Sequence, residues 1–222
     1  METLTHWDRQ VFFWLNHGLS HPWLDPVMWF ITSLGLGWVQ MLVVLAGTLA
    51  PYRDAQGWRL GRRWRSLFLP ALVAFAGSGI TVQIVKKLVP RLRPSNLPEA
   101  LVAHDERIFY GSFPSGHTTT AFALAFWAWL GLRGTRYAWA GWLALIVAGL
   151  VGLSRIYRGV HYPLDVLVGA MLGMAWGWLA YRVAIRLNSS RTQGLPSRES
   201  PPTPTSRETS PPAQSPPRVP NG

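Results

Sequence analysis

Cysteine is absent from the 222-residue sequence, and acidic residues are few. Without cysteine the chain forms no disulfide bond and offers no thiolate for an iron–sulfur cluster or for catalysis. The 21 lysines and arginines outnumber the 10 aspartates and glutamates, which gives a formal net charge of +11. Such an excess is common in nucleic-acid-binding proteins, but here the basic residues form short clusters between long uncharged segments, as in membrane proteins. We therefore expect no nucleic-acid partner.

Large apolar residues are almost missing from residues 188–222, which contain half of the eighteen prolines of the chain. A segment of this composition cannot bury enough apolar surface to offset the entropy lost on ordering. We predict a disordered tail rich in proline, serine and threonine. The alternative is a docking segment in the polyproline conformation, which the same prolines would favour.

Residues 1–187 are treated as one domain. Five long segments of this domain carry almost no charge. A helix needs about 20 mainly apolar residues to cross the hydrocarbon core of a bilayer. We predict an all-α fold, a polytopic membrane helix bundle with about five transmembrane helices. The predicted spans are residues 23–50, 67–85, 115–132, 137–153 and 163–187.

The first 20 residues predict a different kind of helix. Apolar residues recur there at helical spacing, namely Trp7, Val11, Trp14 and Leu15. Polar residues occupy other positions, namely Asp8, Arg9 and Asn16. This pattern is typical of an amphipathic helix that lies at the membrane interface. A cleaved signal peptide is not predicted, because acidic residues lie near the start and no basic region precedes an apolar run.

Basic residues between the predicted spans indicate how the chain is oriented. If successive spans alternate in direction, ten arginines fall on one side: five in residues 51–65, two in "RGTR" and three near the end of the last span. The positive-inside rule assigns that side to the cytoplasm. The basic residues of the opposite side that have no predicted binding role are Lys87, Arg91, Arg107 and Arg158. We therefore expect a multi-pass protein of the inner (cytoplasmic) membrane, with its other polar segments on the extracytoplasmic face.

Three polar segments, "KKLVPRLRP", "FPSGH" and "SRIYRGVHYPLD", reach that face from distant parts of the sequence. Cations this close to a bilayer are unfavourable unless they are solvated, paired or bound to an anion. Arginine and lysine side chains, a serine hydroxyl and the backbone N–H groups at a helix start suit the oxygens of a phosphate. The candidate phosphate-binding residues are Lys86, Arg93, Ser115, Gly116 and Arg155.

His161 and Asp165 are four residues apart, which places them on one face if the segment is helical. The carboxylate can then accept the ring N–H of His161 and leave the other ring nitrogen as a nucleophile. His117 comes from a different segment, and its imidazole could protonate the leaving oxygen. We take His161, His117 and Asp165 as the candidate catalytic residues.

Together these residues resemble the three-part signature of the type 2 phosphatidic acid phosphatase (PAP2) superfamily. The matching parts are K-x6-R-P at residues 86–94, P-S-G-H at residues 114–117 and S-R-x5-H-x3-D at residues 154–165. No signature position is missing, and the resemblance covers roughly residues 67–187. It implies that His161 forms a phosphohistidine, that Asp165 orients it and that His117 protonates the leaving group. It also implies that the phosphatase needs neither a metal ion nor another cofactor.

The short chain, the N-terminal helix and "HPWLDPVMWFIT" further resemble the small bacterial undecaprenyl pyrophosphate phosphatases. This resemblance implies that the membrane lipid undecaprenyl diphosphate is hydrolysed to undecaprenyl phosphate. Phosphatidylglycerophosphate, phosphatidic acid and lipid A phosphates are alternative substrates. Neither the motifs nor the composition predicts an oligomeric state.

Two other functions share part of the pattern. Vanadium haloperoxidases bind vanadate in a similar pocket, but those proteins are soluble, whereas five membrane spans are expected here. A transporter or lipid-binding protein would keep the cations of an anion site. It would not need the nucleophile and acid that His161, Asp165 and His117 represent.

The remaining polar residues near the motifs are predicted to be solvated. Lys87, Arg91 and Arg158 are interpreted as solvated residues at helix ends, with a contact to a diphosphate as the alternative. A solvated loop is predicted to contain His104, Asp105, Glu106 and Arg107, with recognition of a lipid headgroup as the alternative.

Overall fold

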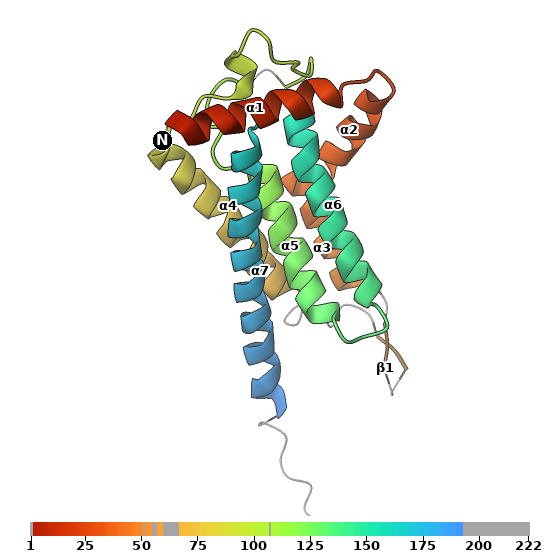
Figure 1. Cartoon of the computed structure of the whole chain (residues 1–222). Coiled ribbons are helices and arrows are strands. Elements are labelled where there is room, and N and C mark those ends of the chain that lie inside the picture. The colour runs from red at the N-terminus through yellow and green to blue at the C-terminus, as the bar shows by residue number, and fades with distance from the viewer. Residues whose placement is uncertain (1, 51, 55–56, 60–66, 107, 193–222) are drawn as a thin grey trace, which may run out of the picture.

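The computed structural model describes residues 2–50, 52–54, 57–59, 67–106 and 108–192. Long helices lie side by side in a bundle, and one further helix crosses an end of it (Figure 1). The protein is a polytopic membrane helix bundle, which confirms the predicted fold class. Arg107 and most of the predicted tail fall outside the described residues.

Four helices form the body of the bundle: α4 (Leu69–Leu88), α5 (Gly116–Leu132), α6 (Ala138–Tyr157) and α7 (Pro163–Thr192). The central helix α5 contacts the other three. The packing of α5 against α7 depends on two glycines of α7 that are four residues apart. A Cβ on Gly177 would lie 2.6 Å from the carbonyl oxygen of Ala123, and a Cβ on Gly173 would overlap the carbonyl oxygen of Thr119. Small residues at such positions let two helix backbones approach each other within a membrane.

Three helical segments are long and apolar enough to cross a membrane: α4, α6 and residues Pro163–Leu187 of α7. The helices α2 (Leu24–Ser33) and α3 (Gly37–Leu49) together qualify as one broken span, with a bend of 61° between them. The remaining predicted span, residues 115–132, is the helix α5, whose 17 residues are at the lower limit of the length that a bilayer requires. Length and composition therefore support three spans, or four with the bent pair, among the described residues.

Two details differ from the expectations. A short antiparallel hairpin of β1 (Tyr52–Asp54) and β2 (Gly57–Arg59) follows α3, where the sequence predicted only a basic loop. The helix α7 also continues to Thr192, past the expected boundary at residue 187. No proline or glycine interrupts residues 188–192, so nothing in the local sequence stops the helix at that boundary.

The helix α1 (Glu2–Gly18) runs across the ends of α6 and α7 (Figure 1). It is helical, as predicted, and its protein-facing side includes polar residues. Phe12 is completely buried, and the polar residues Asp8 and Asn16 are buried one turn to either side of it. Trp7 and Trp14 are 62% and 75% exposed. The aromatic side of α1 therefore faces away from the bundle, and the helix is anchored by buried polar groups.

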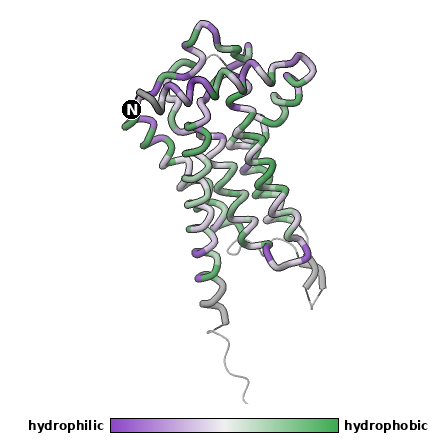
Figure 2. The backbone as a smooth tube through the Cα atoms, viewed as in Figure 1, coloured by the Kyte–Doolittle hydropathy of each residue, from purple (hydrophilic) through white to green (hydrophobic). Residues whose placement is uncertain are grey.

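Hydrophobic residues follow the length of the bundle, and hydrophilic residues gather at its ends (Figure 2). We call the end that α1 crosses the site end; it consists of the C-termini of α4 and α6 and the N-termini of α5 and α7. We call the opposite end, with the α5–α6 turn, the far end. Sequence segments that are far apart meet at the site end.

Candidate active site

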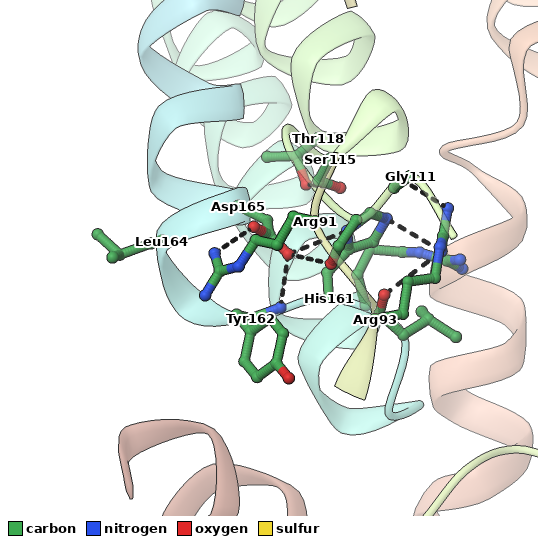
Figure 3. A network of polar contacts seen from close by, with 12 residues as sticks. Arg91, Arg93, Gly111, Ser115, Thr118, His161, Tyr162, Leu164 and Asp165 are labelled. Carbon is green, nitrogen blue, oxygen red and sulfur yellow. Dashed lines mark hydrogen bonds and ion pairs between the residues drawn. The ribbon is translucent and has the colours of Figure 1, made fainter. Parts of the chain in front are cut away.

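The site end brings the three predicted polar segments together (Figure 3). Lys86 lies in the last turn of α4, and Arg93 directly precedes the short 3-10 helix η2 (Pro94–Asn96). Ser115 is the N-cap of α5, and Arg155 lies in the last turn of α6. Asp165 lies in the first turn of α7. Each motif therefore supplies its polar groups from a helix end, as the spacing predicted.

The imidazole of His161 lies between Asp165 and Arg93. Its Nδ1 atom is 3.5 Å from Asp165 Oδ2, and its Nε2 atom is 3.4 Å from Arg93 Nη1. The first distance is longer than a usual N–H···O hydrogen bond, so the pair is close but not tightly bonded. A proton on Nδ1 directs the lone pair of Nε2 toward the cationic side of the site.

The electrostatic environment keeps His161 neutral near pH 7. The pKa of His161 is lowered from 6.5 to about 4, chiefly by burial; Arg93 and Arg155 also lower it, whereas Asp165 acts in the opposite direction. A neutral imidazole retains the lone pair that a nucleophile needs.

Asp165 is completely buried and is held by several donors. Its Oδ2 atom accepts hydrogen bonds from the Ser112 hydroxyl at 2.5 Å and from the Tyr162 backbone N–H at 2.9 Å. Its Oδ1 atom accepts a hydrogen bond from Arg91 Nη1 at 2.6 Å. Hydrogen bonds of this kind stabilise the ionised carboxylate and fix its orientation toward His161.

Lys86 and Arg93 converge on one carbonyl group. The oxygen of Gly111 accepts a hydrogen bond from Lys86 Nζ at 2.6 Å and one from Arg93 Nη2 at 3.3 Å. Gly111 has a φ of +66°, a left-handed conformation that glycine adopts without steric cost. Burial and the neighbouring Arg155 both lower the pKa of Arg93. The two cations thus lie in a buried, positively charged region that an anion would stabilise.

The start of α5 contributes small polar groups. The Ser115 hydroxyl accepts a hydrogen bond from Thr118 Oγ1 at 2.9 Å, and the Ser115 backbone N–H donates to the Asp165 carbonyl oxygen at 3.0 Å. A Cβ on Gly116 would meet only Val82, at 3.6 Å, which is an ordinary contact. The protein's own packing therefore does not require glycine at position 116, whereas a phosphate close to the first N–H groups of the helix would.

His117 reaches the same region from α5. It lies close enough to Arg155, Arg93 and His161 to interact electrostatically with each. Gly35, at the bend between α2 and α3, leaves room for the ring, because a Cβ there would lie 2.8 Å from His117 Cδ2. All eight residues that the sequence singled out are therefore brought to one site.

Glu106 corrects one prediction from the sequence. We expected a solvated loop residue, but its carboxylate pairs with two arginines. Oε1 and Oε2 lie 2.5 Å from Arg155 Nη1 and Nη2, and Oε1 also accepts a hydrogen bond from Arg158 Nε at 2.9 Å. Burial would raise the pKa of Glu106, but the two arginines outweigh it and lower the pKa from 4.5 to about 2. Glu106 is therefore ionised. It occupies both Nη groups of Arg155, a residue that the sequence predicted to bind phosphate.

The predictions for the nearby basic residues have mixed outcomes. Arg158 is buried and also contacts Asp105 at 2.5 Å, so its interpretation as a solvated helix-end residue is wrong. Arg91 is bonded to Asp165 and Asp8, and the same interpretation is wrong for it. Lys87 is exposed, as predicted. The acidic partners lie far from these arginines in sequence, so no local pattern pointed to the pairs.

An apolar cavity of about 790 Å³ extends between α3, α5, α6 and α7. Leu34 and Val151 line it, and a Cβ on Gly35 would lie 2.7 Å from Val151 Cγ1 and 2.8 Å from His117 Cδ2, so the cavity comes close to the site. Gln40 also lines the cavity, and its buried amide has no hydrogen-bond partner for either Nε2 or Oε1 among the described residues. The cavity is large enough for part of a lipid chain.

Comparison with known proteins agrees with this geometry. The sequence profile of the PAP2 superfamily matches residues 67–189. The chain is 33% identical over 174 residues to the bacitracin transport permease protein BcrC of Bacillus licheniformis, covering 77% of both chains. It is 30% identical over 182 residues to the putative undecaprenyl-diphosphatase YbjG of Escherichia coli, covering 77% of this chain and 82% of the relative. The crystal structure of Aquifex aeolicus LpxE superposes with a TM-score of 0.64 and 26% identity, over 78% of this chain and 93% of LpxE.

Proposed function

Because the chain belongs to the PAP2 superfamily, we propose that it hydrolyses a lipid phosphate or diphosphate through a phosphohistidine intermediate on His161. The observation that carries this proposal is the buried, neutral imidazole of His161, placed between the carboxylate of Asp165 and the guanidinium of Arg93. The carboxylate can hold the ring N–H while the opposite nitrogen faces the cations that would bind a phosphoryl group.

In the first step, Nε2 of His161 attacks phosphorus while the bond from phosphorus to the leaving oxygen breaks. His117 donates a proton to that oxygen, and Asp165 stabilises the positive charge on the His161 ring. In the second step, water attacks the phosphohistidine, His117 accepts a proton from the water, and inorganic phosphate leaves. His161 is then neutral again and both histidines have returned to their starting states.

Lys86, Arg93 and Arg155, with the hydroxyl of Ser115 and the N–H of Gly116, would hold the phosphoryl oxygens during both steps. These groups supply positive charge of the kind that a metal ion supplies in other phosphatases. We therefore propose a reaction that needs no metal ion. The contact of Arg155 with Glu106 leaves its Nε atom buried without a partner among the described residues, and this N–H is available to a phosphoryl oxygen.

We propose undecaprenyl diphosphate as the first substrate to test, with undecaprenyl phosphate as the product. The name of the relative YbjG supports this choice, as does the apolar cavity beside the site. Phosphatidylglycerophosphate, phosphatidic acid and lipid A present the same phosphate chemistry and are the alternatives. The arginines of the far end support a location in the cytoplasmic membrane with the site on the extracytoplasmic side.

Phosphate release by the full-length protein in detergent tests the proposal. With a chelator present, the wild type is expected to release phosphate from undecaprenyl diphosphate, and His161→Ala is expected to lose at least about 10³-fold in kcat. His6→Ala, which changes an exposed histidine of α1, is the matched control and should retain full turnover. Full turnover by His161→Ala would refute the nucleophile.

A second candidate function is binding or transport of a lipid phosphate without hydrolysis, which the name of the relative BcrC favours. The same experiment separates the two. Tight binding of undecaprenyl diphosphate with no phosphate release from any of the four lipids would support the non-catalytic function.

A further inference from the structure

We propose that Asp8, on the N-terminal helix, is a positioning residue for the pair of His161 and Asp165, and that it acts through Arg91. This inference rests on the proposed function of that pair. Asp8 lies outside the region that the family profile matches, which begins at residue 67. No motif in the sequence identified it.

A continuous chain of contacts joins the two carboxylates. Asp8 Oδ2 lies 2.5 Å from Arg91 Nη2, and Arg91 Nη1 lies 2.6 Å from Asp165 Oδ1. Asp165 Oδ2, its other oxygen, faces His161 Nδ1 at 3.5 Å. The guanidinium of Arg91 also lies over the ring of Tyr162, 4.2 Å from its centroid. Two carboxylates and an aromatic face together restrict the guanidinium to one plane and one rotation.

The second oxygen of Asp8 acts on the backbone that carries Asp165. Asp8 Oδ1 accepts a hydrogen bond from the Leu164 N–H at 2.9 Å, in the first turn of α7. N–H groups in this turn have no partner within their own helix, so a side chain that accepts one fixes the start of the helix. Asp8 thus holds Asp165 twice, once through the side chain of Arg91 and once through the neighbouring peptide.

Charge balance explains why an acid is needed at position 8. Arg91 stabilises ionised Asp165, but a cation with only that partner would also draw the carboxylate away from His161. Asp8 also binds the guanidinium of Arg91, so Arg91 attracts Asp165 less strongly. Asp165 therefore keeps more of its interaction with the ring N–H of His161. The side chain of Asp8 is only 1% exposed, so water screens this interaction weakly. The charged and titratable groups that face His161 from other elements are Arg93, Arg155 and His117.

The test is Asp8→Asn in the full-length protein, assayed with whichever lipid phosphate the wild type hydrolyses. The change keeps the shape of the side chain and removes its charge. We expect kcat to fall about tenfold, as for loss of a group that orients a reacting residue, with KM changed less than about twofold. We also expect the acid limb of kcat/KM against pH to move to lower pH, because a weaker interaction with Asp165 makes His161 less basic.

Asn16→Ala is the matched control. Asn16 lies on the same buried side of α1 and donates to the carbonyl oxygens of Leu101 and Tyr157, at 2.9 and 2.8 Å. Its loss removes hydrogen bonds at the C-terminal part of α1, about two turns from Asp8, and leaves the contacts of Asp8 with Arg91 and Leu164 in place. We expect Asn16→Ala to lower the thermal unfolding temperature and to leave kcat and the acid limb unchanged.

A double-mutant cycle tests the route through Arg91. If Asp8 acts through this residue, Asp8→Asn adds no further loss of kcat in an Arg91→Gln background. Arg91→Lys keeps the charge but cannot bridge two carboxylates in the same way, and we expect a loss of kcat like that of Asp8→Asn. Arg91→Lys also tests the inference if Asp8→Asn fails to fold. The inference is overturned if Asp8→Asn or Arg91→Lys has the kcat and the acid limb of the wild type. It is also overturned if the losses of kcat in the double mutant are fully additive. Both outcomes count only if the wild type is active and His161→Ala is inactive. An inactive wild type would instead refute the proposed function.

Discussion

Basic residues gather at both ends of the helix bundle, but their surroundings differ. At the site end, Arg93, Arg155 and Arg158 are at least nine-tenths buried, and Glu106 pairs with the latter two. At the far end, Arg133 and Arg136 are exposed. The side chain of Arg133 lies over the rings of Trp129 and Tyr181, at 5.8 and 5.7 Å, and that of Arg136 lies over Tyr137 at 4.7 Å.

The difference shows that the number of cations does not distinguish a binding site from a membrane anchor. An exposed arginine over an aromatic ring at a membrane boundary can direct its charge into water at little cost. A buried arginine needs an anion, and Arg93 contacts carbonyl oxygens and His161 but no carboxylate among the described residues. Burial together with incomplete pairing therefore supports the proposal that the site end binds phosphate.

The largest expected effect separates the two ends directly. Arg155→Ala should lower kcat/KM for the lipid substrate by about 10²–10³, because the proposed donor to the transferring phosphoryl group is lost. Arg133→Ala, at the far end, should change kcat/KM by less than about twofold. Arg155→Lys keeps the charge without the planar fork and should fall between them. The comparison of the two ends would fail if Arg155→Ala and Arg133→Ala had equal effects on phosphate release.

A smaller effect concerns the stability that Glu106 gives the folded protein by pairing with Arg155 and Arg158. The lowered pKa of Glu106 means that ionised Glu106 stabilises the folded state above its ordinary pKa of 4.5, and that this contribution is lost as pH falls toward about 2. The contribution at neutral pH is about 3 kcal/mol. We expect the unfolding temperature of the wild type to drop across this acidic range more steeply than that of Glu106→Gln. Thermal unfolding followed by circular dichroism in detergent measures this, and parallel curves for the two proteins would contradict it.

The parts of the structure that the sequence predicted correctly depend on local pattern. Uncharged runs located the membrane helices, and the K-x6-R-P, P-S-G-H and S-R-x5-H-x3-D spacings located Lys86, His117, His161 and the residues around them. Such patterns predict helix ends well because a polar residue that follows an apolar run has few alternatives to the membrane surface.

The parts that the sequence did not predict depend on contacts between distant segments. The ion pair of Arg91 with Asp8 joins residues 83 positions apart, and that of Arg155 with Glu106 joins residues 49 positions apart. Taken alone, each of these carboxylates resembles an ordinary solvated residue. Only the placement of α1 and of the loop before α5 shows that Asp8 is buried, and Glu106 partly buried, beside arginines.

The smallest expected effect concerns Gln40, which lines the apolar cavity between the two ends. A buried amide without a partner costs free energy unless a ligand supplies one. A polyprenyl chain has no polar group to offer, whereas the ester carbonyl of a phosphatidyl lipid accepts a hydrogen bond. Gln40→Leu should therefore raise KM about tenfold for phosphatidylglycerophosphate, the value of one hydrogen bond, and leave KM for undecaprenyl diphosphate unchanged or lower. Steady-state kinetics with both lipids measure the two values. A rise in KM for undecaprenyl diphosphate, or no rise for phosphatidylglycerophosphate, would contradict a hydrogen bond between Gln40 and an ester carbonyl.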